Sequence, residues 1–226
     1  MIELSLATKQ FETETIQTTA LNKVNLSIEQ GEFVSIMGPS GSGKTTLLNI
    51  LGMFENLDTG NYTLLDKSVR ELSYGARLEL RRECLGYVFQ SFNLIPHLSV
   101  LENVELPLKY RGYKRLDRKR LALESLEKMS LGNRVDHMPY QISGGQQQRV
   151  AIARACVSKP TLILADEPTG NLDTTSGQTV LDALCDINRN GTTIVMVTHS
   201  KVAASMSSRK LNMVDGQIVD FGGKGN

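Results

Sequence analysis

Residues 38–46, GPSGSGKTT, combine residue types that suit phosphate binding. They match the pattern G-x-x-x-x-G-K-[ST] at Gly38, Gly43, Lys44 and Thr45. Glycines allow successive backbone N–H groups to turn toward phosphate oxygens. Lys44 can reach the β- and γ-phosphates, and the Thr45 hydroxyl can ligate Mg²⁺. We therefore predict a loop that holds the phosphates of a nucleotide.

The segments on either side of this loop support the prediction. FVSIM (33–37) is a short β-rich run, and LLNIL (47–51) is apolar on both sides of one Asn. This pattern indicates a phosphate-binding loop when a strand precedes it and a helix follows it. A helix that begins near Lys44 would also direct the positive end of its dipole toward the phosphates. The alternative is a glycine-rich surface turn, which leaves the flanking strand and helix unexplained.

Hydrolysis of a nucleotide also needs a metal ligand and a group that activates water. LILADEP (162–168) offers two carboxylates at the end of an expected buried strand. In a parallel sheet, that end faces the crevice where ligands bind. We expect Asp166 to hold Mg²⁺, directly or through water, and Glu167 to polarise the attacking water. The alternative is a strand-ending turn before Pro168.

A third stretch, ISGGQQQRVAIARA (142–155), places Ser143, Gly144 and Gly145 at the start of an expected helix. A helix N-terminus favours an anion, but a second phosphate site is redundant for one bound nucleotide. The economical interpretation is that the serine contacts the γ-phosphate of a nucleotide held by another copy, in a head-to-tail dimer with ATP at the interface. As a helix cap alone, the same residues would be ordinary.

The apolar pattern predicts the elements that must position these residues. Strands are expected near 2–6, 24–28, 33–37, 63–65, 86–89, 162–165, 192–197, 211–214 and 217–219. Helices are expected over 44–51, 74–82, 100–109, 117–129, 146–157 and 175–189. This order predicts a parallel α/β core, an antiparallel β layer at the N-terminal end and a helical insertion in the middle.

Composition narrows the class of protein. The 25 Lys and Arg residues against 24 Asp and Glu give a net charge of +1, which offers no general argument for nucleic acid. Cys84, Cys156 and Cys185 are far apart and form no metal-binding pattern, so reduced thiols in a cytoplasmic protein are the simpler interpretation. There is no signal-peptide pattern and no apolar run near the roughly 20 residues that span a bilayer. Any membrane span is expected to come from another chain.

Together the motifs resemble those of ABC transporter ATPase subunits. ISGGQ is similar to their LSGGQ signature, with Ile142 in place of the usual Leu. The resemblance covers essentially the whole chain, and the full ordered set is far more specific than a phosphate loop alone. In order, its parts are Phe11, Gly38–Thr46, Gln90, Ser143–Gln147, Asp166–Glu167, Asn171–Asp173 and His199.

The resemblance implies an α/β fold of the P-loop NTPase, ABC ATPase type. Such a fold has a RecA-like parallel-sheet core, an antiparallel β subdomain and an inserted helical subdomain. We expect a single ABC ATPase domain over 1–226. Within it, about 1–90 and 159–226 would form the core and the antiparallel β subdomain, and about 91–158 the helical signature subdomain.

The resemblance also implies roles for individual residues. Phe11 would stack on adenine, and Asp173 would cross the dimer interface. Gln90 would ligate Mg²⁺ and contact water, and His199 would hydrogen-bond the γ-phosphate. The alternatives are a core aromatic, a surface glutamine and a structural histidine. The residues expected to contact ATP are Phe11, Gly38, Pro39, Ser40, Gly41, Ser42, Gly43, Lys44, Thr45, Thr46, Gln90, Ser143, Gly144, Gly145, Gln146 and Asp173. Those expected to hold Mg²⁺ are Thr45, Gln90 and Asp166, and the expected catalytic residues are Glu167 and His199.

Two stretches after Gln90 bear on partners. SFNLIPHLSVLENVELPL (91–108) could form a docking groove for a short helix of a membrane subunit or be buried within the helical subdomain. Its apolar residues include Phe92, Leu94, Ile95, Leu98 and Val100. KYRGYKRLDRKR (109–120) is strongly basic. We interpret it as a solvated face, or one near anionic lipid headgroups, rather than a nucleic-acid site.

EPTGNLD (167–173) and the stretch after Gln90 are similar to those of the ABC ATPases that drive lipoprotein release and macrolide or peptide export. The resemblance implies an ATP-hydrolysing homodimer, with ATP and Mg²⁺ as cofactors, on the inner face of the cell membrane. Its partner would be a separate permease with a large extracytoplasmic domain, and no nucleic-acid partner is expected. The alternatives are a cell-division-type signalling or scaffold subunit, and an ABC ATPase that acts on DNA or ribosomes. The single compact cassette and neutral charge argue against the last.

Overall fold

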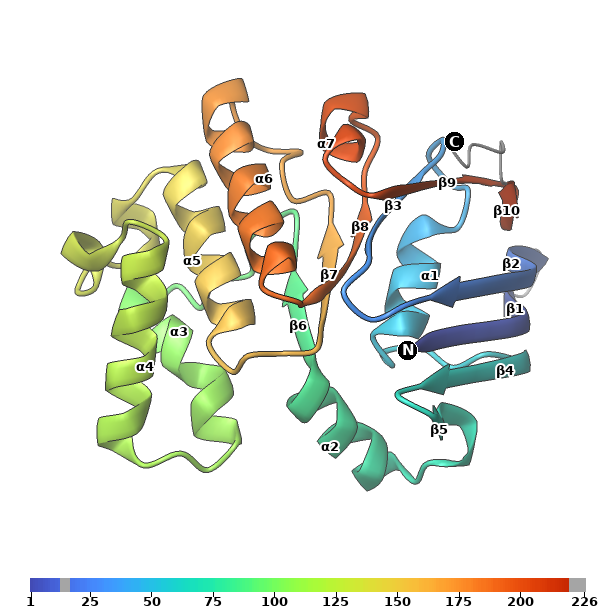
Figure 1. The fold of residues 1–226 in the computed structure, drawn as a ribbon, viewed down its shortest axis with the longest axis horizontal. Helices are drawn as coiled ribbons and strands as arrows, with labels where there is room; N and C mark the ends of the chain where they lie inside the picture. The colour runs from blue at the N-terminus through green and yellow to red at the C-terminus, as the bar shows by residue number, and fades with distance from the viewer. Residues whose placement is uncertain (13–16, 220–226) are drawn as a thin grey trace.

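The computed structural model describes residues 1–12 and 17–219, and a six-stranded sheet runs through its middle (Figure 1). The strand order is β10-β9-β3-β8-β7-β6. All neighbouring strands are parallel except β9 and β10, so the carboxyl ends of five strands meet at one edge. The strands are β3 (Phe33–Met37), β6 (Leu85–Val88), β7 (Leu162–Asp166), β8 (Thr193–Val197), β9 (Arg209–Val214) and β10 (Gln217–Val219).

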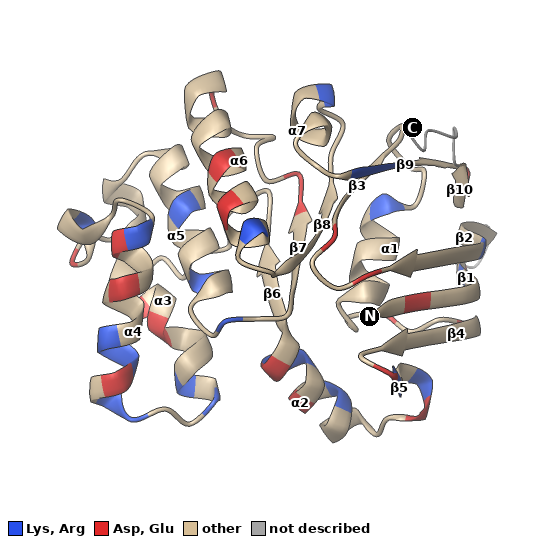
Figure 2. Cartoon of the chain, in the orientation of Figure 1, with Lys and Arg blue, Asp and Glu red and all other residues tan. Residues whose placement is uncertain are grey.

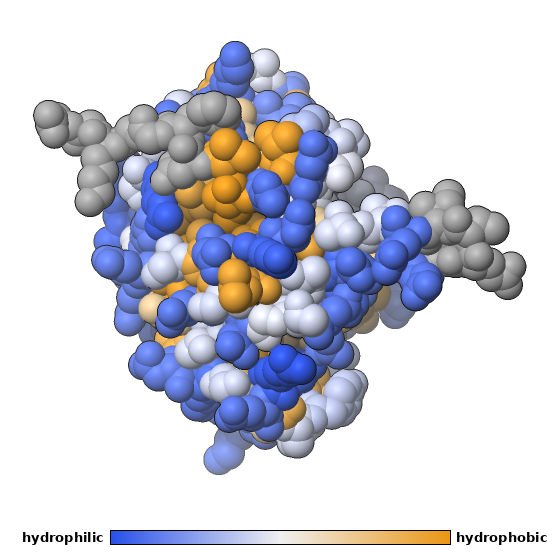
Figure 3. Space-filling model, turned by 90° about the vertical axis from the view of Figure 1, so that its right-hand side faces the viewer, coloured by the Kyte–Doolittle hydropathy of each residue, from blue (hydrophilic) through white to orange (hydrophobic). Residues whose placement is uncertain are grey.

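The second sheet is antiparallel, with the order β2-β1-β4-β5. Its strands are β1 (Ile2–Glu12), β2 (Gln17–Ile28), β4 (Thr59–Leu64) and β5 (Lys67–Ser68). Helix α1 (Lys44–Leu51) lies between the two sheets and packs in a core that both share (Figure 1). Seen from the side of the antiparallel sheet, hydrophobic residues form a patch within a mainly hydrophilic surface (Figure 3).

The middle of the chain forms three helices that pack on one another. They are α3 (Val100–Tyr110), α4 (Arg115–Lys128) and α5 (Gly144–Cys156), and their shared core contains Val104, Leu126 and Val150. The remaining helices are α2 (Tyr74–Cys84), α6 (Thr174–Arg189) and α7 (Lys201–Ser205), with short 3-10 turns at 69–71, 132–134 and 139–141. Among the described residues, no helix combines the length and apolar character needed to cross a membrane.

Alternate residues of β7 face two different cores. Leu162 and Leu164 pack with α1, whereas Ile163 and Ala165 pack with α5 and α6. Because side chains alternate along a strand, a parallel strand covered on both faces needs an unbroken apolar run. This explains the sequence LILA, and it fixes the strand so that Asp166 emerges at the carboxyl edge.

The expected parallel core, antiparallel layer and central helices are all present. The predicted bounds of β3, α1 and β10 are those observed. However, β1 continues past Leu6 to Glu12, and β2 begins at Gln17 rather than near Val24. Both extensions are largely exposed and polar, so they carry no apolar alternation.

Candidate functional site

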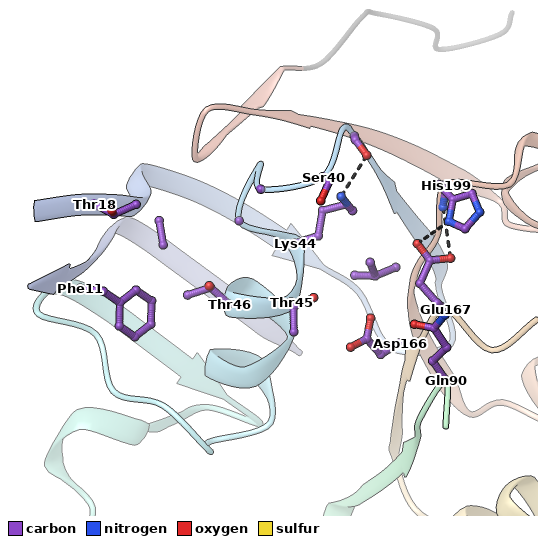
Figure 4. Close-up of a pocket in the computed structure, with 15 residues that line it drawn as sticks. Phe11, Thr18, Ser40, Lys44, Thr45, Thr46, Gln90, Asp166, Glu167 and His199 are labelled. Atoms are coloured by element: carbon purple, nitrogen blue, oxygen red, sulfur yellow. Dashed lines mark hydrogen bonds and ion pairs between the residues drawn. The ribbon is translucent and has the colours of Figure 1, made fainter. Parts of the chain in front are cut away.

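The loops that follow β3, β6, β7 and β8 carry the predicted motifs, and they border an open cavity of about 560 Å³ (Figure 4). We call it the nucleotide cavity. It brings the glycine-rich loop together with Gln90, Asp166, Glu167 and His199, which are far apart in the sequence. The full lining is Phe11, Thr18, Ala20, Gly38, Ser40, Gly41, Gly43, Lys44, Thr45, Thr46, Gln90, Asp166, Glu167, Val197 and His199.

The phosphate loop joins β3 to α1. Among the described residues, no side chain caps α1 or α4, whereas α2, α3, α5, α6 and α7 each have a Ser or Asp side-chain cap. The first N–H groups of α1 can therefore face an anion in the cavity. Gly43 has a φ of 99°, and a Cβ there would lie 2.2 Å from the Ala20 carbonyl oxygen. This close approach of β2 to the loop requires glycine.

Lys44 folds over its own loop. Its Nζ donates hydrogen bonds to the carbonyl oxygens of Gly38 at 2.9 Å and Pro39 at 2.7 Å, and it lies 3.5 Å from Ser42 Oγ. Pro39 and Ser42 shape the loop without lining the cavity, and Ser42 is buried. Phosphate oxygens would offer this ammonium stronger, charge-assisted acceptors than the carbonyls.

Asp166 lies between Thr45 and Glu167 (Figure 4). Burial raises the pKa of its carboxyl, the charge of Glu167 raises it further, and Lys44 acts in the opposite direction. Two carboxylates held together in a partly buried cavity favour a cation between or beside them. Because Thr45 and Gln90 add neutral oxygen donors to the same lining, the donor set suits a hard cation such as Mg²⁺.

Glu167 occupies the sharp turn after β7 with a left-handed φ of 45°. Its N–H donates to the Val197 carbonyl oxygen at 2.9 Å. One carboxylate oxygen lies 2.9 Å from His199 Nδ1, and the other accepts the backbone N–H of His199 at 3.3 Å (Figure 4). A left-handed backbone conformation is costly for a glutamate, so it persists only where surrounding contacts hold it. The hydrogen bonds to Val197 and His199 do so here, and they keep the carboxylate at the edge of the cavity.

Phe11 lies at the other end of the cavity, on β1 opposite Thr18 of β2 (Figure 4). Its side chain is 43% exposed, so it is not a core aromatic. The Lys9 ammonium lies 5.3 Å from its ring centroid. Thr18, Ala20 and Val197 also line the cavity, although no sequence motif predicted them. The hairpin register would have revealed Thr18, but small residues such as Ala20 carry no sequence signal.

The predicted residues Ser143, Gly144, Gly145, Gln146 and Asp173 are not brought into the nucleotide cavity of their own chain. Ser143 Oγ accepts the N–H of Gln146 at 3.3 Å, and Gln146 Oε1 accepts the N–H of Ser143 at 3.0 Å, which forms a capping box at the start of α5. Asp173 caps α6 by accepting the N–H of Ser176 at 2.9 Å. Within one chain, Ser143, Gln146 and Asp173 therefore act in helix caps.

A second cavity, also of about 560 Å³, opens between α2, β6 and the end of α3. We call it the groove. Phe54 and Tyr87 meet edge to face at 5.5 Å between ring centroids, and Arg81 lies 4.7 Å from the Phe54 ring. The groove is thus mainly apolar and bordered by arginines. Its lining is Phe54, Leu78, Arg81, Arg82, Leu85, Gly86, Tyr87, Phe89, Asn93, Leu106, Pro107, Tyr110, Arg154, Ala155 and Ser158.

The stretch 91–108 contributes less to this groove than the docking interpretation implied. Only Asn93, Leu106 and Pro107 of that stretch line it. Val100 is fully buried among α3, α4 and α5, and Leu94 packs against the same cluster. The structure therefore shows burial within the helical region for Val100 and Leu94, which was the alternative interpretation of this stretch. The reason is that α3 turns its apolar face toward α4 and α5.

Lys and Arg residues gather on α4 and on the turn before it (Figure 2). Part of this charge serves internal contacts. Arg111 Nε donates to the Arg82 carbonyl oxygen at 2.7 Å, and Arg118 pairs with Glu105 at 3.5 Å. Lys114, Arg115 and Lys119 are exposed, so the remaining charge of 109–120 lies on a solvated face.

Comparison with known proteins gives consistent matches. Residues 21–170 match the family model described as ABC transporter. The chain is 44% identical over 219 residues to the uncharacterized ABC transporter ATP-binding protein YvrO of Bacillus subtilis, covering 97% of this chain and 96% of that protein. It is 47% identical over 220 residues to the macrolide export ATP-binding/permease protein MacB of Chlorobaculum tepidum, covering 97% of this chain but 34% of that protein. A dimeric structure of the ATP-binding cassette MJ0796 bound to ADP and Pi matches with a TM-score of 0.90 and 43% identity, over 96% of each chain.

Proposed function

Because this chain belongs to the ABC transporter family and is an ATP-hydrolysing enzyme with the ABC ATPase fold, we propose that it binds ATP with Mg²⁺ in the nucleotide cavity and powers a membrane permease. The observation that supports this most strongly is the cavity itself, where loops from four parallel strands converge. We assign 91–158 to a helical signature subdomain and the remainder to the core and antiparallel subdomain.

Each predicted group has a task in nucleotide binding. The free N–H groups at the start of α1 and the loop glycines bind phosphate oxygens. Lys44 exchanges its loop carbonyls for the β- and γ-phosphates, and Phe11 stacks on adenine. Thr45, Gln90 and Asp166 would hold Mg²⁺, which would neutralise charge on the transferring phosphoryl group.

Hydrolysis requires a polarised water in line with the γ-phosphate. Glu167 accepts a hydrogen bond from that water and takes its proton as the water oxygen bonds to the γ-phosphorus, while the bond to the β–γ bridging oxygen breaks and ADP leaves. His199, already in contact with Glu167, donates a hydrogen bond to the γ-phosphate. The distance of 2.9 Å between His199 Nδ1 and Glu167 Oε1 supports their acting on one reacting centre.

A second copy completes the site in this proposal. Ser143, Gly144, Gly145 and Gln146 present the start of α5 to the γ-phosphate bound by the partner, and Asp173 lies at the same interface. In support, Ser143 and Asp173 are exposed at the starts of α5 and α6, outside the cavity of their own chain, and two matching structures are described as dimeric. Closure around two ATP molecules and opening after hydrolysis would drive the cycle.

The groove is the proposed docking surface for a short amphipathic helix of the permease. Its apolar lining suits the apolar face of such a helix, and its arginines suit an acidic residue at the rim. Arg154, which lines the groove, donates to the carbonyl oxygens of Phe92 and Asn93 at 2.8 and 2.6 Å. These residues follow Gln90 closely, so the groove is connected mechanically to the nucleotide cavity.

The relatives point to a class of transport. MacB proteins carry the ATP-binding part and the permease in one chain, whereas YvrO matches this chain over nearly its whole length. In line with the resemblance of the motifs, we propose a separate permease, with the present chain at the inner, cytoplasmic face of the cell membrane. We propose export, lipoprotein release or force transmission as the work that ATP drives. A cell-division-type signalling subunit is the alternative.

Co-purification after mild detergent extraction tests the partner. We expect a multi-span protein to be recovered with the chain, and Leu106→Glu in the groove to lose it while ATPase activity remains. Leu116→Glu, at a position that is 84% exposed outside the groove, is the matched control. Recovery of division proteins would favour the signalling alternative, and equal recovery by both variants would contradict docking in the groove.

A further inference from the structure

Gln148 of α5 is fully buried but does not line the nucleotide cavity. Its Nε2 donates to the carbonyl oxygen of Pro168 at 2.7 Å and to that of Phe89 at 3.3 Å. Phe89 directly precedes Gln90, and Pro168 directly follows Glu167. One buried amide thus binds the backbone of both loops, next to the two residues that the mechanism needs.

Asn171 joins the same loops from the outer side. Its Nδ2 donates to the Gln90 carbonyl oxygen at 3.2 Å, and its Oδ1 lies 3.4 Å from the Gln90 side-chain Nε2. Gly170 makes room for this contact, because a Cβ there would lie 2.8 Å from Gln90 Nε2. The Gln90 amide is therefore seated on the Glu167–Asn171 turn.

We propose that Gln148 and Asn171 are positioning residues that hold Gln90 and Glu167 as one rigid unit. The proposal rests on the roles that the proposed function gives to Gln90 and Glu167. Neither Gln148 nor Asn171 lines the nucleotide cavity, so each acts through its neighbours.

An amide at position 148 has one physical cost and one benefit. Gln148 Oε1 is buried with no hydrogen-bond partner among the described residues, and such an atom destabilises the fold. An apolar residue would avoid that cost but would remove the Gln148 donor from the Pro168 carbonyl and one of the two donors from the Phe89 carbonyl, which also accepts the N–H of Phe92 at 3.3 Å. The turn also contains Glu167 in a strained left-handed conformation, which persists only while surrounding contacts hold it.

The same helix links this unit to the proposed dimer interface. Ser143 starts α5, and Gln148 lies one and a half turns further along it. A rigid shift of α5 when Ser143 meets a phosphate therefore moves the donor that holds both loops. A displacement of about 1 Å at a reacting group can cost about 100-fold in rate.

Turnover and nucleotide affinity, measured separately, test the proposal. Gln148→Met keeps a long side chain but removes both donated hydrogen bonds, and Asn171→Ala removes the outer contact. The matched control is Asn188→Leu, because Asn188 Nδ2 also donates to two backbone carbonyls, those of Gly31 and Thr192, each at 2.9 Å and outside the cavity.

We expect Gln148→Met and Asn171→Ala each to lower kcat about 10- to 100-fold while the Kd for a non-hydrolysable ATP analogue stays within about threefold. The double variant should lose less than the product of the two effects, because both act on one unit. Asn188→Leu should lower thermal stability without changing kcat. Folded variants with kcat within about twofold of wild type would overturn the proposal.

If Gln148→Met fails to fold, Asn171→Ala alone tests the proposal. Asn171 is exposed, so its replacement by alanine should leave the fold intact. Glu167→Gln is assayed in parallel. Normal turnover in Glu167→Gln would remove the proposed function itself. Lost turnover in Glu167→Gln together with normal turnover in Asn171→Ala would overturn only the positioning role.

Discussion

His199 Nδ1 lies 2.9 Å from Glu167 Oε1, although 31 residues separate the two in the chain. The contact forms because both follow adjacent parallel strands, β7 and β8, at the carboxyl edge of one sheet. The Glu167 side chain is 15% exposed and that of His199 is 71% exposed, so the carboxylate is held while the imidazole stays reachable. This arrangement suits a base that is fixed in the cavity and a partner that meets the nucleotide.

Glu167→Gln should abolish ATP turnover while ATP binding remains. The amide keeps the shape of the side chain but cannot take a proton from water. We expect a loss in kcat of at least about 100-fold and accumulation of an ATP-bound dimer, measured by phosphate release and by size-exclusion chromatography with ATP. Turnover near the wild-type rate would remove Glu167 from its role as base.

Lys44→Ala should weaken nucleotide binding itself. The ammonium would pair with the β- and γ-phosphates, and a charge-assisted contact is worth about 1.5–3 kcal/mol, or roughly 10- to 150-fold in Kd. Calorimetric titration with a non-hydrolysable ATP analogue measures this change. Unchanged affinity in a folded variant would speak against the assignment of the phosphate loop.

Gly43→Ala should be more destructive than Gly41→Ala. Both residues have positive φ, at 99° and 79°, so alanine strains the backbone by about 1–2 kcal/mol at either position. Only at Gly43 would the new Cβ also collide with Ala20, whereas nothing lies within 4 Å of it at Gly41. Chemical denaturation should show a larger loss of stability for Gly43→Ala, and equal losses would contradict the close packing of β2 on the loop.

Asp58 should stabilise the fold near neutral pH and lose that effect in acid. The Gln10 N–H, donated at 2.6 Å, and then the Lys9 ammonium hold the pKa of this carboxyl below its ordinary value. A lowered folded pKa means that the stabilisation is present above the unfolded pKa, about 3.9, and disappears as the pH falls through the folded value. Asp58→Asn should therefore lower the urea midpoint at pH 7, and the difference from wild type should shrink below about pH 4.

The effect at Asp58 should be modest, below about 1 kcal/mol, because the pair with Lys9 is partly exposed to solvent. The exposed Asp66 provides a control through Asp66→Asn, for which we expect no comparable change. A difference between Asp58→Asn and wild type that grew as the pH fell would contradict the sign of the shift.

The parts of the molecule with long apolar runs or dense glycine patterns were predictable from sequence. FVSIM, LILA and IVMV are buried on both faces, and the phosphate loop between β3 and α1 needs its glycines. Those local signals also located Asp166, Glu167 and His199, because each residue follows such a run. Strand ends therefore carried most of the information about the site.

The rest depended on tertiary contacts that leave no local pattern. The groove draws residues from α2, β6 and α3 together, so no single segment displays it. In the sequence, Gln148 is one of three consecutive glutamines. Only its burial and its hydrogen bonds to the carbonyls of Phe89 and Pro168 distinguish it from the other two. α7 and β5 are five and two residues long, too short for periodicity to be recognised.

Whether two copies share each nucleotide can be seen in a crystal structure of the Glu167→Gln variant with ATP and Mg²⁺. We expect a dimer in which Ser143 of one copy lies within hydrogen-bond distance of the γ-phosphate held by the phosphate loop of the other. An ATP-loaded structure with Ser143 remote from every triphosphate in both copies would contradict it.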